Sequence, residues 1–552
     1  MEITPASSIY TPTRNRSRSR TRNSTANSRS TSATRRPSLG PSRRSLSSLS
    51  LPRLSTLEKG GDKPVNSVLT TLDNSLPLEF FKQDVIALIK VLKISKWHKR
   101  TLLPANLSIN RISGALTNSV YKLEYRDSEK TLPLLLLRVY GKSTELIIDR
   151  DLELNCLIKL SLKKIGPRML GIFTNGRFEQ FLEGFRTLNK TDIRDNVLSQ
   201  ILGRRMKDLH YKMDLDIEDL VSDLPTCWKF IYKWMNVFEN DCLADYLEEL
   251  QEKVFLMSFA DFKKLIFKYK SWLFGKYDNE RIPSNFKFCH NDAQYGNLLL
   301  HELFDKSEVL VKDGSENDSE FVSTSHNRDN NLVVIDFEYL GANFPAFDLA
   351  NHFCEWMADY HDETRSYYMD ENKFPTKNQQ LNFIKSYVEY DFQYPTSNLK
   401  TEADDTLEAK NLMELINFEI KKLYNECIFW RSSVSTYWCL WGVIQNGPLN
   451  KLAILNSTQE RVVDSTYSIT SNMENLVISE TGTPPSAAND DGIVVEEAIT
   501  SSDDDFDYLK YAGQKAALFI GDSLQFGLLE KLDLSPGALA AVKYMDAKPF
   551  EL

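Results

Sequence analysis

Apolar runs that end in carboxylate and amide side chains mark the most informative part of the sequence. Residues 286–289 form a strand-like run that leads into a turn containing Asp292, and Asn297 precedes a second apolar run. Further along, the β-branched run 333–335 predicts a buried strand that ends at Asp336. An acid and an amide are therefore expected between two strands, and a second acid is expected at the end of a third.

Strand and helix patterns divide the rest of the chain into a strand-rich part followed by a helix-rich part. Apolar runs predict strands over 112–123 (a hairpin), 134–140, 169–173 and 176–182. Apolar residues at helical spacing predict helices over 76–97, 148–157, 192–213, several within 225–278, 347–360, 412–444 and 514–529. The apolar face of the first of these helices is expected to contain Phe80, Val85, Ile86, Ile89 and Leu92.

The two acids and the amide fit the chemistry of phosphoryl transfer. That reaction needs a carboxylate near the attacking hydroxyl group, and oxygen ligands that hold Mg²⁺ against the nucleotide phosphates. Asp292 is the expected proton acceptor, and Asn297 and Asp336 are the expected metal ligands. A lone His-x-Asp sequence would be weak support, because a buried His beside a loop Asp is more often a structural pair.

Three motifs that follow one another in the right order make the sequence resemble a known family. Residues 290–297 read HNDAQYGN, residues 334–339 read VIDFEY and residues 351–356 read NHFCEW. No Ala-Pro-Glu sequence follows, unlike in protein kinases, and the pattern resembles the choline/ethanolamine kinase family, above all its fungal members. The resemblance implies an α+β, protein-kinase-like fold of two lobes, with a small β-rich N-terminal lobe and a larger, mostly helical C-terminal lobe.

The same resemblance implies ATP and Mg²⁺ as cofactors and assigns residues to the nucleotide. Arg138 is a lone cation in an apolar strand, where burial is costly unless an anion pairs with it. It would take the place of the kinase lysine, with Glu153 on the next helix as its partner. The assigned residues are Ser113, Gly114, Thr117 and Asn118 in the phosphate loop, Arg138 and Glu153, and Gln180, Phe181 and Leu182 in the adenine hinge.

A pocket for a cationic amino alcohol also follows from the resemblance. An onium group binds between aromatic rings, each worth up to about 2 kcal/mol when desolvated. Two tryptophans three residues apart on a helix are, without that context, more often core residues. His290 is expected to support the catalytic loop by hydrogen bonding rather than take part in the chemistry, and Asp348 is expected to be either a helix cap or a brace of that loop. The residues assigned to the substrate are Glu355, Tyr360, Trp438, Trp441 and Tyr511.

Composition predicts the division into domains. The first 53 residues contain 11 Arg and one acid, a composition that cannot bury enough apolar surface to fold. We expect residues 1–76 to be a disordered Arg/Ser-rich tail, 77–182 to be the nucleotide-binding lobe and 183–552 to be the catalytic and substrate lobe. Acid-rich segments at about 302–331 and 456–505 are expected to be disordered insertions in that second lobe.

Charge and cysteine content bear on partners and location. The whole chain has a formal net charge of −9, and because the first 53 residues contribute +10, the remaining residues carry about −19, which speaks against nucleic-acid binding by the catalytic body. Seven scattered cysteines without a CxxC pair are typical of a reduced, cytoplasmic protein, and no apolar run approaches the ~20 residues of a membrane span. The resemblance implies a possible homodimer. Arginine pairs precede Ser38, Ser45 and Ser47, which fits basophilic protein kinases as well as a plain solvated tail.

The expected reaction is the ATP-dependent phosphorylation of choline for phosphatidylcholine synthesis, with activity on ethanolamine. Methyl-sized differences in an apolar pocket discriminate by only about 1 to 3 kcal/mol, so ethanolamine kinase stays the alternative. A catalytically inactive kinase-like scaffold would lack one of the proposed catalytic residues, and all are present. An aminoglycoside-type phosphotransferase would share the first motif but not the NHFCEW helix or the paired tryptophans.

Overall fold

The computed structural model describes residues 65–112, 118–127, 131–140, 150–163, 165–277, 282–305, 326–390, 407–449, 506–546 and 548–552. All of them belong to one compact unit, Leu49–Leu552. Within these ranges, no helix combines the length and the hydropathy needed to cross a membrane.

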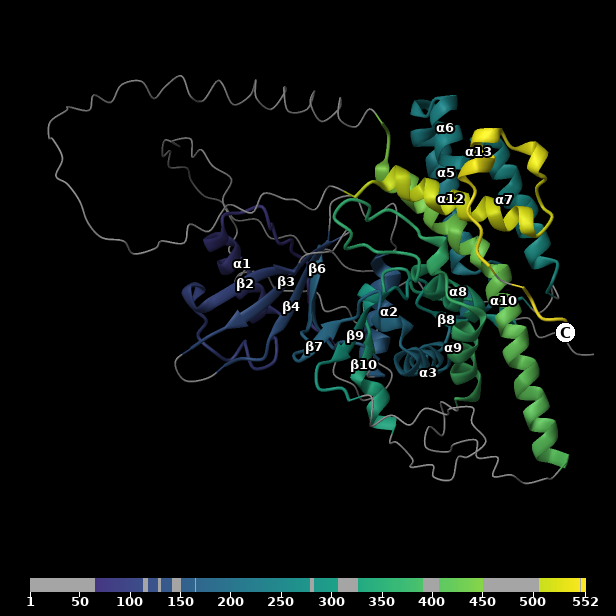
Figure 1. The fold of residues 1–552 in the computed structure, drawn as a ribbon. Helices are drawn as coiled ribbons and strands as arrows, with labels where there is room; N and C mark the ends of the chain where they lie inside the picture. The colour runs from purple at the N-terminus through teal and green to yellow at the C-terminus, as the bar shows by residue number, and fades with distance from the viewer. Residues whose placement is uncertain are drawn as a thin grey trace, which may run out of the picture. The chain divides into compact units, whose positions relative to one another are not determined.

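A six-stranded sheet forms the N-terminal lobe (Figure 1). Its strands, in spatial order, are β1 (Ser67–Val68), β5 (Met169–Phe173), β6 (Gly176–Gln180), β4 (Leu135–Tyr140), β3 (Asn118–Tyr125) and β2 (Leu107–Ile112). The pairing of β2 with β3 confirms the hairpin predicted over 112–123. Strand β1 corrects the predicted end of the tail at residue 76. Ser67 and Val68 pair with β5, because Val68 supplies an apolar side chain that the lobe buries.

Successive side chains along β4 point alternately into the core and toward the opposite face of this sheet. Leu137 and Val139 point into the core shared with helix α1 (Leu78–Val91), and Arg138 therefore lies on the opposite face. The apolar face of α1 differs from the expected one at a single position. Phe81 is buried, whereas Phe80 is 46% exposed, because the helix begins at Leu78 and turns Phe81 toward the sheet.

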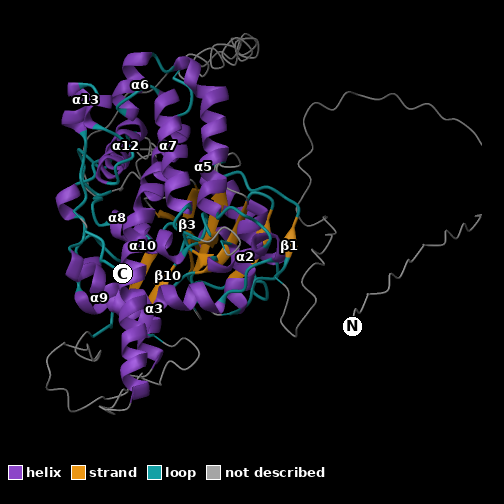
Figure 2. Cartoon of the chain, turned by 90° about the vertical axis from the view of Figure 1, so that its right-hand side faces the viewer, coloured by secondary structure: helices purple, strands orange, loops and turns teal. Residues whose placement is uncertain are grey.

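The C-terminal lobe is mostly helical (Figure 2). Helix α2 (Arg150–Leu162) joins the lobes, and the helices that follow are α3 (Asn196–Lys212), α4 (Ile217–Leu220), α5 (Thr226–Val237), α6 (Glu248–Phe255), α7 (Phe259–Phe274), α8 (Pro345–Glu355), α9 (Lys377–Glu389), α10 (Leu407–Asn446), α12 (Tyr508–Gln525) and α13 (Pro536–Ala541). The region predicted as helical over 412–444 is one helix of 40 residues. The helix predicted over 514–529 begins earlier, at Tyr508, where Asp507 caps its first turn, and it is followed by α13.

Two small sheets lie between the helices and carry the acidic loops. Strands β10 (Leu332–Val334), β9 (Leu298–His301) and β7 (Phe185–Thr187) form one, and β11 (Gly341–Asn343) pairs with β8 (Lys287–Cys289) in the other. The insertion predicted as disordered over 302–331 is ordered at its end. His326–Asn331 forms a 3₁₀ helix in which Asp329 is buried against Arg204, an ion pair that fixes this segment on α3.

Candidate active site

Two neighbouring loops place the acids and the amide at one site. The loop after β8 carries Asp292 and Asn297, and the loop after β10 carries Asp336. The Ile335 N–H group donates to the Asn297 carbonyl oxygen over 2.9 Å, which ties the two loops together. Asn291 and Asp336 both have φ of 64°, a left-handed conformation that non-glycine residues adopt rarely and most often at functional sites.

Asp348, on helix α8, anchors the loop that follows β8. Its carboxylate accepts the backbone N–H groups of His290 and Asn291 over 2.7 and 2.8 Å, and it pairs with His210 Nε2 at 3.0 Å. Burial opposes ionisation of Asp348, but the hydrogen bond and charge of His210 outweigh burial and lower the pKa of the carboxyl group. Of the two roles expected for Asp348, the geometry supports the brace of the catalytic loop.

His290 also has a supporting place. The Asp292 N–H group donates to its Nδ1 atom, so Nε2 carries the proton and donates to the Ile335 carbonyl oxygen over 2.9 Å. Burial lowers the pKa of the imidazole, which keeps the ring neutral. A neutral ring with both nitrogens engaged positions the loops and does not act as a base.

Asp292 and Asn297 face each other across the loop. The Asn297 Nδ2 group donates to the carboxylate and to the carbonyl oxygen of Asp292, each over 2.9 Å. Burial raises the pKa of Asp292 well above its usual range, and the negative charges of Glu355 and Asp336 raise it further. A carboxylate in such surroundings has an increased affinity for a proton.

Arg138 reaches the loop of the other lobe instead of its expected partner. Its guanidinium lies 2.9 Å from Asp336 and 3.0 Å from Glu338. Burial disfavours the charge on Asp336, but Arg138 outweighs burial and lowers the pKa of that carboxyl group. The expected Arg138–Glu153 pair is therefore wrong. Glu153 pairs with Arg177 at 2.7 Å, because β4 and β6 place Arg177 directly opposite Arg138 on the same face of the sheet.

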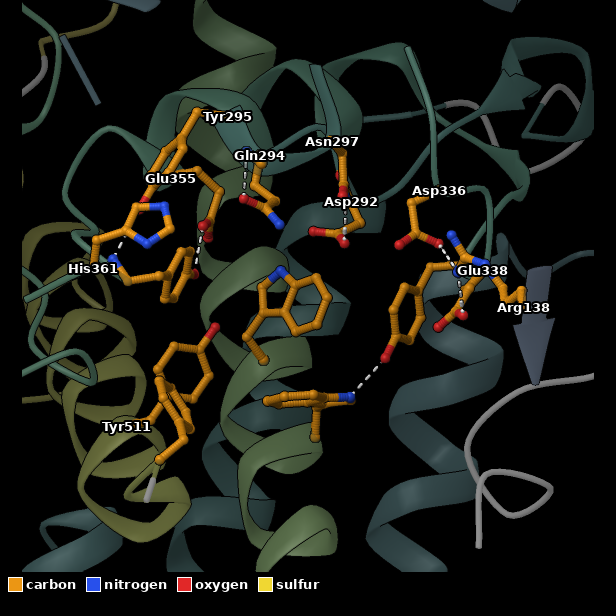
Figure 3. Close-up of a pocket in the computed structure, with 16 residues that line it drawn as sticks. Arg138, Asp292, Gln294, Tyr295, Asn297, Asp336, Glu338, Glu355, His361 and Tyr511 are labelled. Atoms are coloured by element: carbon orange, nitrogen blue, oxygen red, sulfur yellow. Dashed lines mark hydrogen bonds and ion pairs between the residues drawn. The ribbon is translucent and has the colours of Figure 1, made fainter. Parts of the chain in front are cut away.

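One pocket joins these groups to the proposed substrate residues, as Figure 3 shows. Arg138, Asp336 and Glu338 lie at one end, and Glu355 and Tyr511 lie at the other. The residues that line it are Arg138, Asp292, Gln294, Tyr295, Gly296, Asn297, Asp336, Glu338, Tyr339, Glu355, Tyr360, His361, Trp438, Trp441, Phe506 and Tyr511.

The two tryptophans form a fixed aromatic corner in this pocket. Their ring centroids are 5.5 Å apart at an interplanar angle of 79°, and Tyr511 meets Trp441 edge-on at 5.9 Å. Each indole N–H group has a buried acceptor at 2.7 Å, which is Asn351 for Trp438 and the Tyr339 hydroxyl group for Trp441. These hydrogen bonds orient the rings, so the aromatic faces are preorganised before a ligand arrives.

Comparison with known proteins identifies the family. A family model described as choline/ethanolamine kinase matches residues 109–520, and one described as choline kinase N terminus matches residues 59–102. The chain belongs to the choline/ethanolamine kinase family. It is therefore a phosphotransferase that uses ATP, as the sequence motifs predicted.

Individual relatives agree with this family assignment. A choline kinase from Saccharomyces cerevisiae is 36% identical over 493 residues, which cover 84% of this chain and 79% of that protein. An ethanolamine kinase from the same yeast is 31% identical over 479 residues, which cover 83% and 79%. The crystal structure of a choline kinase from Cryptosporidium parvum Iowa II has a TM-score of 0.50 at 18% identity and covers 81% of this chain and 97% of its own, which confirms the protein-kinase-like fold.

Several residues of this kinase that were assigned to the nucleotide either fall outside the described residues or are not among the described residues that line the pocket. Ser113, Gly114 and Thr117 fall outside the described residues, and Asn118 is described only as the first residue of β3. The hinge residues Gln180, Phe181 and Leu182 directly follow or end β6 and are not part of the pocket lining among the described residues. Their assignment stays a prediction.

The kinase pocket also contains residues that sequence reasoning did not assign. Glu338 and Tyr339 lie two and three positions after Asp336, the predicted metal ligand, in the VIDFEY motif, so their proximity to it was available as a signal. Gln294 lies within the HNDAQYGN motif and accepts the Gly296 N–H group at 2.8 Å. Lys515, a buried cation on α12, does not line the pocket but lies 3.1 Å from Glu355, which does, and no motif indicated it.

Proposed function

We propose that this family member is a choline kinase, which transfers the γ-phosphoryl group of ATP to the hydroxyl group of choline for phosphatidylcholine synthesis and also accepts ethanolamine. The supporting observation is that one pocket combines two chemically different ends. Asp292 and Asp336 lie at the end suited to phosphoryl transfer, and Tyr511 lies at the opposite end, where it contacts Trp441 and where aromatic rings suit an onium group.

In this proposal, Mg²⁺ is held by Asn297 and Asp336. The donor set fits, because both residues offer oxygen atoms, and the Asn297 amide N–H₂ group is committed to Asp292, which leaves its carbonyl oxygen available. Bound Mg²⁺ would neutralise negative charge on the nucleotide phosphates. Arg138 would add a fixed positive charge beside the same phosphates.

Asp292 would act as the proton acceptor in the transfer. The choline oxygen forms a bond to the γ-phosphorus, the bond from that phosphorus to the bridging oxygen breaks, and ADP leaves. The hydroxyl proton passes to the Asp292 carboxylate. The raised pKa of Asp292 supports this role, because a carboxylate of increased proton affinity is a better general base.

The nucleotide would lie between the lobes. We assign its phosphates to the loop at 113–118 and its adenine to Gln180, Phe181 and Leu182, at the boundary between a nucleotide lobe over 77–182 and a substrate lobe over 183–552. Glu153 would act indirectly. Glu153 forms an ion pair with Arg177, which lies opposite Arg138 on the neighbouring strand. By fixing Arg177, Glu153 would position Arg138 against the phosphates.

The aromatic corner favours choline over ethanolamine as the better substrate. Methyl groups on nitrogen bind to ring faces, whereas a primary ammonium group needs hydrogen-bond acceptors. Ethanolamine kinase is the second candidate, because Glu355 lies at the same end of the pocket and can accept from a primary ammonium group.

Three further features of the proposal concern the whole chain. We propose a cytoplasmic enzyme, which the seven free cysteines support. We also propose a homodimer, testable by light scattering. Ser38, Ser45 and Ser47, which lie outside the described residues, would be substrates of basophilic protein kinases, testable by mass spectrometry of the phosphorylated protein.

A coupled assay of ADP release tests the central proposal. With Mg·ATP, kcat/KM for choline should exceed that for ethanolamine, and Asp292→Asn should abolish both while ATP binding remains. A higher kcat/KM for ethanolamine would establish the second candidate. No turnover of either amino alcohol would overturn the proposal and favour an inactive scaffold.

A further inference from the structure

The acid at the cation end of the pocket already has a cationic partner inside the protein. Lys515 Nζ lies 3.1 Å from Glu355 Oε1, and the Tyr360 hydroxyl group donates to Oε2 over 2.5 Å. The Lys515 and Glu355 side chains are only 1% and 2% exposed. Both oxygens of Glu355 therefore accept a hydrogen bond before any substrate arrives.

Lys515 does not line the pocket itself but contacts Glu355, which does. Among the described residues, Glu355, Tyr360 and Tyr511 line the pocket and Lys515 does not. Its Nζ atom lies 5.1 Å from the centre of the Tyr511 ring, on the helix that also supplies this ring. A substrate cation in the pocket would meet an ion pair, whose positive member repels it, rather than a free carboxylate.

We propose that Lys515 is a specificity-determining residue that favours quaternary over primary ammonium substrates by occupying the charge and the acceptor capacity of Glu355. This inference rests on the proposed function. A primary ammonium group, as in ethanolamine, depends on hydrogen-bond acceptors, and Lys515 and Tyr360 already occupy one acceptor site on each oxygen of Glu355. A quaternary ammonium group donates no hydrogen bond and binds through contacts with the aromatic rings. Lys515 therefore weakens the binding of a quaternary ammonium group less than that of a primary one.

The other groups around Glu355 are consistent with this role. Asp292 lines the same pocket, and its pKa is raised by burial and then by the charge of Glu355. Tyr360 and Tyr511 stay protonated, because burial and the charge of Glu355 raise their pKa values. Lys515 is therefore the cation that balances Glu355 in the structure.

The test compares three ligands with wild type and with Lys515→Met in the full chain. Choline and ethanolamine measure the preference between the two ammonium groups, and 3,3-dimethylbutan-1-ol is the uncharged analogue of choline. Binding is measured by calorimetry with ADP and Mg²⁺ present, and turnover by ADP release. In Lys515→Met, we expect the ethanolamine-to-choline ratio of kcat/KM to rise by about fivefold or more. Binding of the uncharged analogue should change less than binding of either cation.

Matched variants separate charge from structure. Lys515→Arg keeps the charge and should retain the wild-type ratio, and Lys515→Gln serves if Lys515→Met does not fold. Lys510→Met removes an exposed cation from the same helix and should leave the ratio unchanged. An unchanged or lowered ratio in Lys515→Met, or an equal loss for all three ligands, would overturn the proposal. Absence of choline binding and turnover in wild type would instead contradict the proposed function.

Discussion

The Arg138 guanidinium bonds to the Asp336 carboxylate over 2.9 Å, although the two residues are 198 positions apart in the sequence. The same nitrogen lies 3.0 Å from Glu338. One buried cation thus connects the sheet of the N-terminal lobe to the loop proposed to hold the metal. This link adds a charged contact to the apolar core that the two lobes share.

Replacing Arg138 should impair use of the nucleotide more than use of the amino alcohol. Lysine keeps the charge but cannot present several donors in one plane, so Arg138→Lys should lower kcat/KM for ATP by about tenfold to a hundredfold. Arg138→Met should lower it further, because Asp336 and Glu338 lose their shared cation. Initial rates at varied ATP measure both effects. Arg126→Lys, at an exposed ion pair with Glu124, is the control and should behave as wild type. Equal losses toward ATP and choline would contradict this expectation.

The aromatic corner should control choline affinity and leave ATP affinity unchanged. Trp441→Leu removes one ring face and should raise KM for choline by about tenfold to thirtyfold, as expected for a cation–π contact of about 2 kcal/mol. Tyr339→Phe keeps its ring but removes the acceptor of the Trp441 N–H group, and should raise this KM by only about threefold to fivefold.

A double variant tests whether these two effects share one cause. If Tyr339 acts by orienting Trp441, adding Tyr339→Phe to Trp441→Leu should cause little further loss. Fully additive losses, or a rise in KM for ATP equal to that for choline, would show that the corner does not act as proposed.

The proximity of the three proposed catalytic residues could be predicted from the sequence because their signal is local. Asp292, Asn297 and Asp336 each adjoin a short apolar run, so the strand ends alone bring them close together. The Arg138–Glu153 pair was wrong for the opposite reason. Which cation meets Glu153 depends on the register of β4 against β6, and that register places Arg177 opposite Arg138. Strand register is set by long-range packing that no short motif records.

Other features also depended on contacts between distant segments. The two-residue strand β1 is too short to leave a periodic pattern, and it exists because β5 offers an unpaired edge. Lys515 lies on a helix whose extent was predicted in part, but its orientation toward Glu355 arises from the packing of both α12 and α8 against α10. A sequence shows that a lysine is present and cannot show that it is buried.

Asp348 should support turnover without contacting substrate. It is the shared acceptor for two backbone N–H groups of the catalytic loop and for His210. In Asp348→Asn one oxygen becomes an N–H₂ group that faces these donors, so kcat should fall by about a hundredfold or more with little change in KM. Breaking this buried pair should also lower the free energy of unfolding by about 3 kcal/mol.

Steady-state kinetics and urea unfolding measure the two effects of Asp348→Asn. The control is Asp370→Asn, at an exposed turn where the carboxylate accepts the Asn372 N–H group, and its effect on both should be small. A rise in KM for choline without a fall in kcat would mean that Asp348 affects the pocket and not the loop.

Glu426 on α10 should make stability decrease as the pH rises through neutrality. Burial raises its pKa from 4.5 to about 7. The positive charge of Lys422 lowers this pKa, and the negative charge of Glu419 raises it. Between these two values the folded state binds a proton that the unfolded state has lost, so the free energy of unfolding falls as the pH increases. Glu426→Gln mimics the protonated side chain and should stabilise the protein at pH 8 by at most about 3 kcal/mol, and much less at pH 5.

Urea unfolding of wild type and Glu426→Gln at several pH values measures this difference. The quantity that matters is the difference between the two proteins, because other acids contribute equally to both. Glu414→Gln, at an exposed position on the same helix, is the matched control and should give a difference that does not vary with pH. A difference for Glu426→Gln that is the same at pH 5 and pH 8 would show that this carboxyl group titrates alike in the folded and unfolded chain. Glu426 would then affect stability only through its packing beside Tyr277, whose hydroxyl group accepts a hydrogen bond from the Trp430 indole.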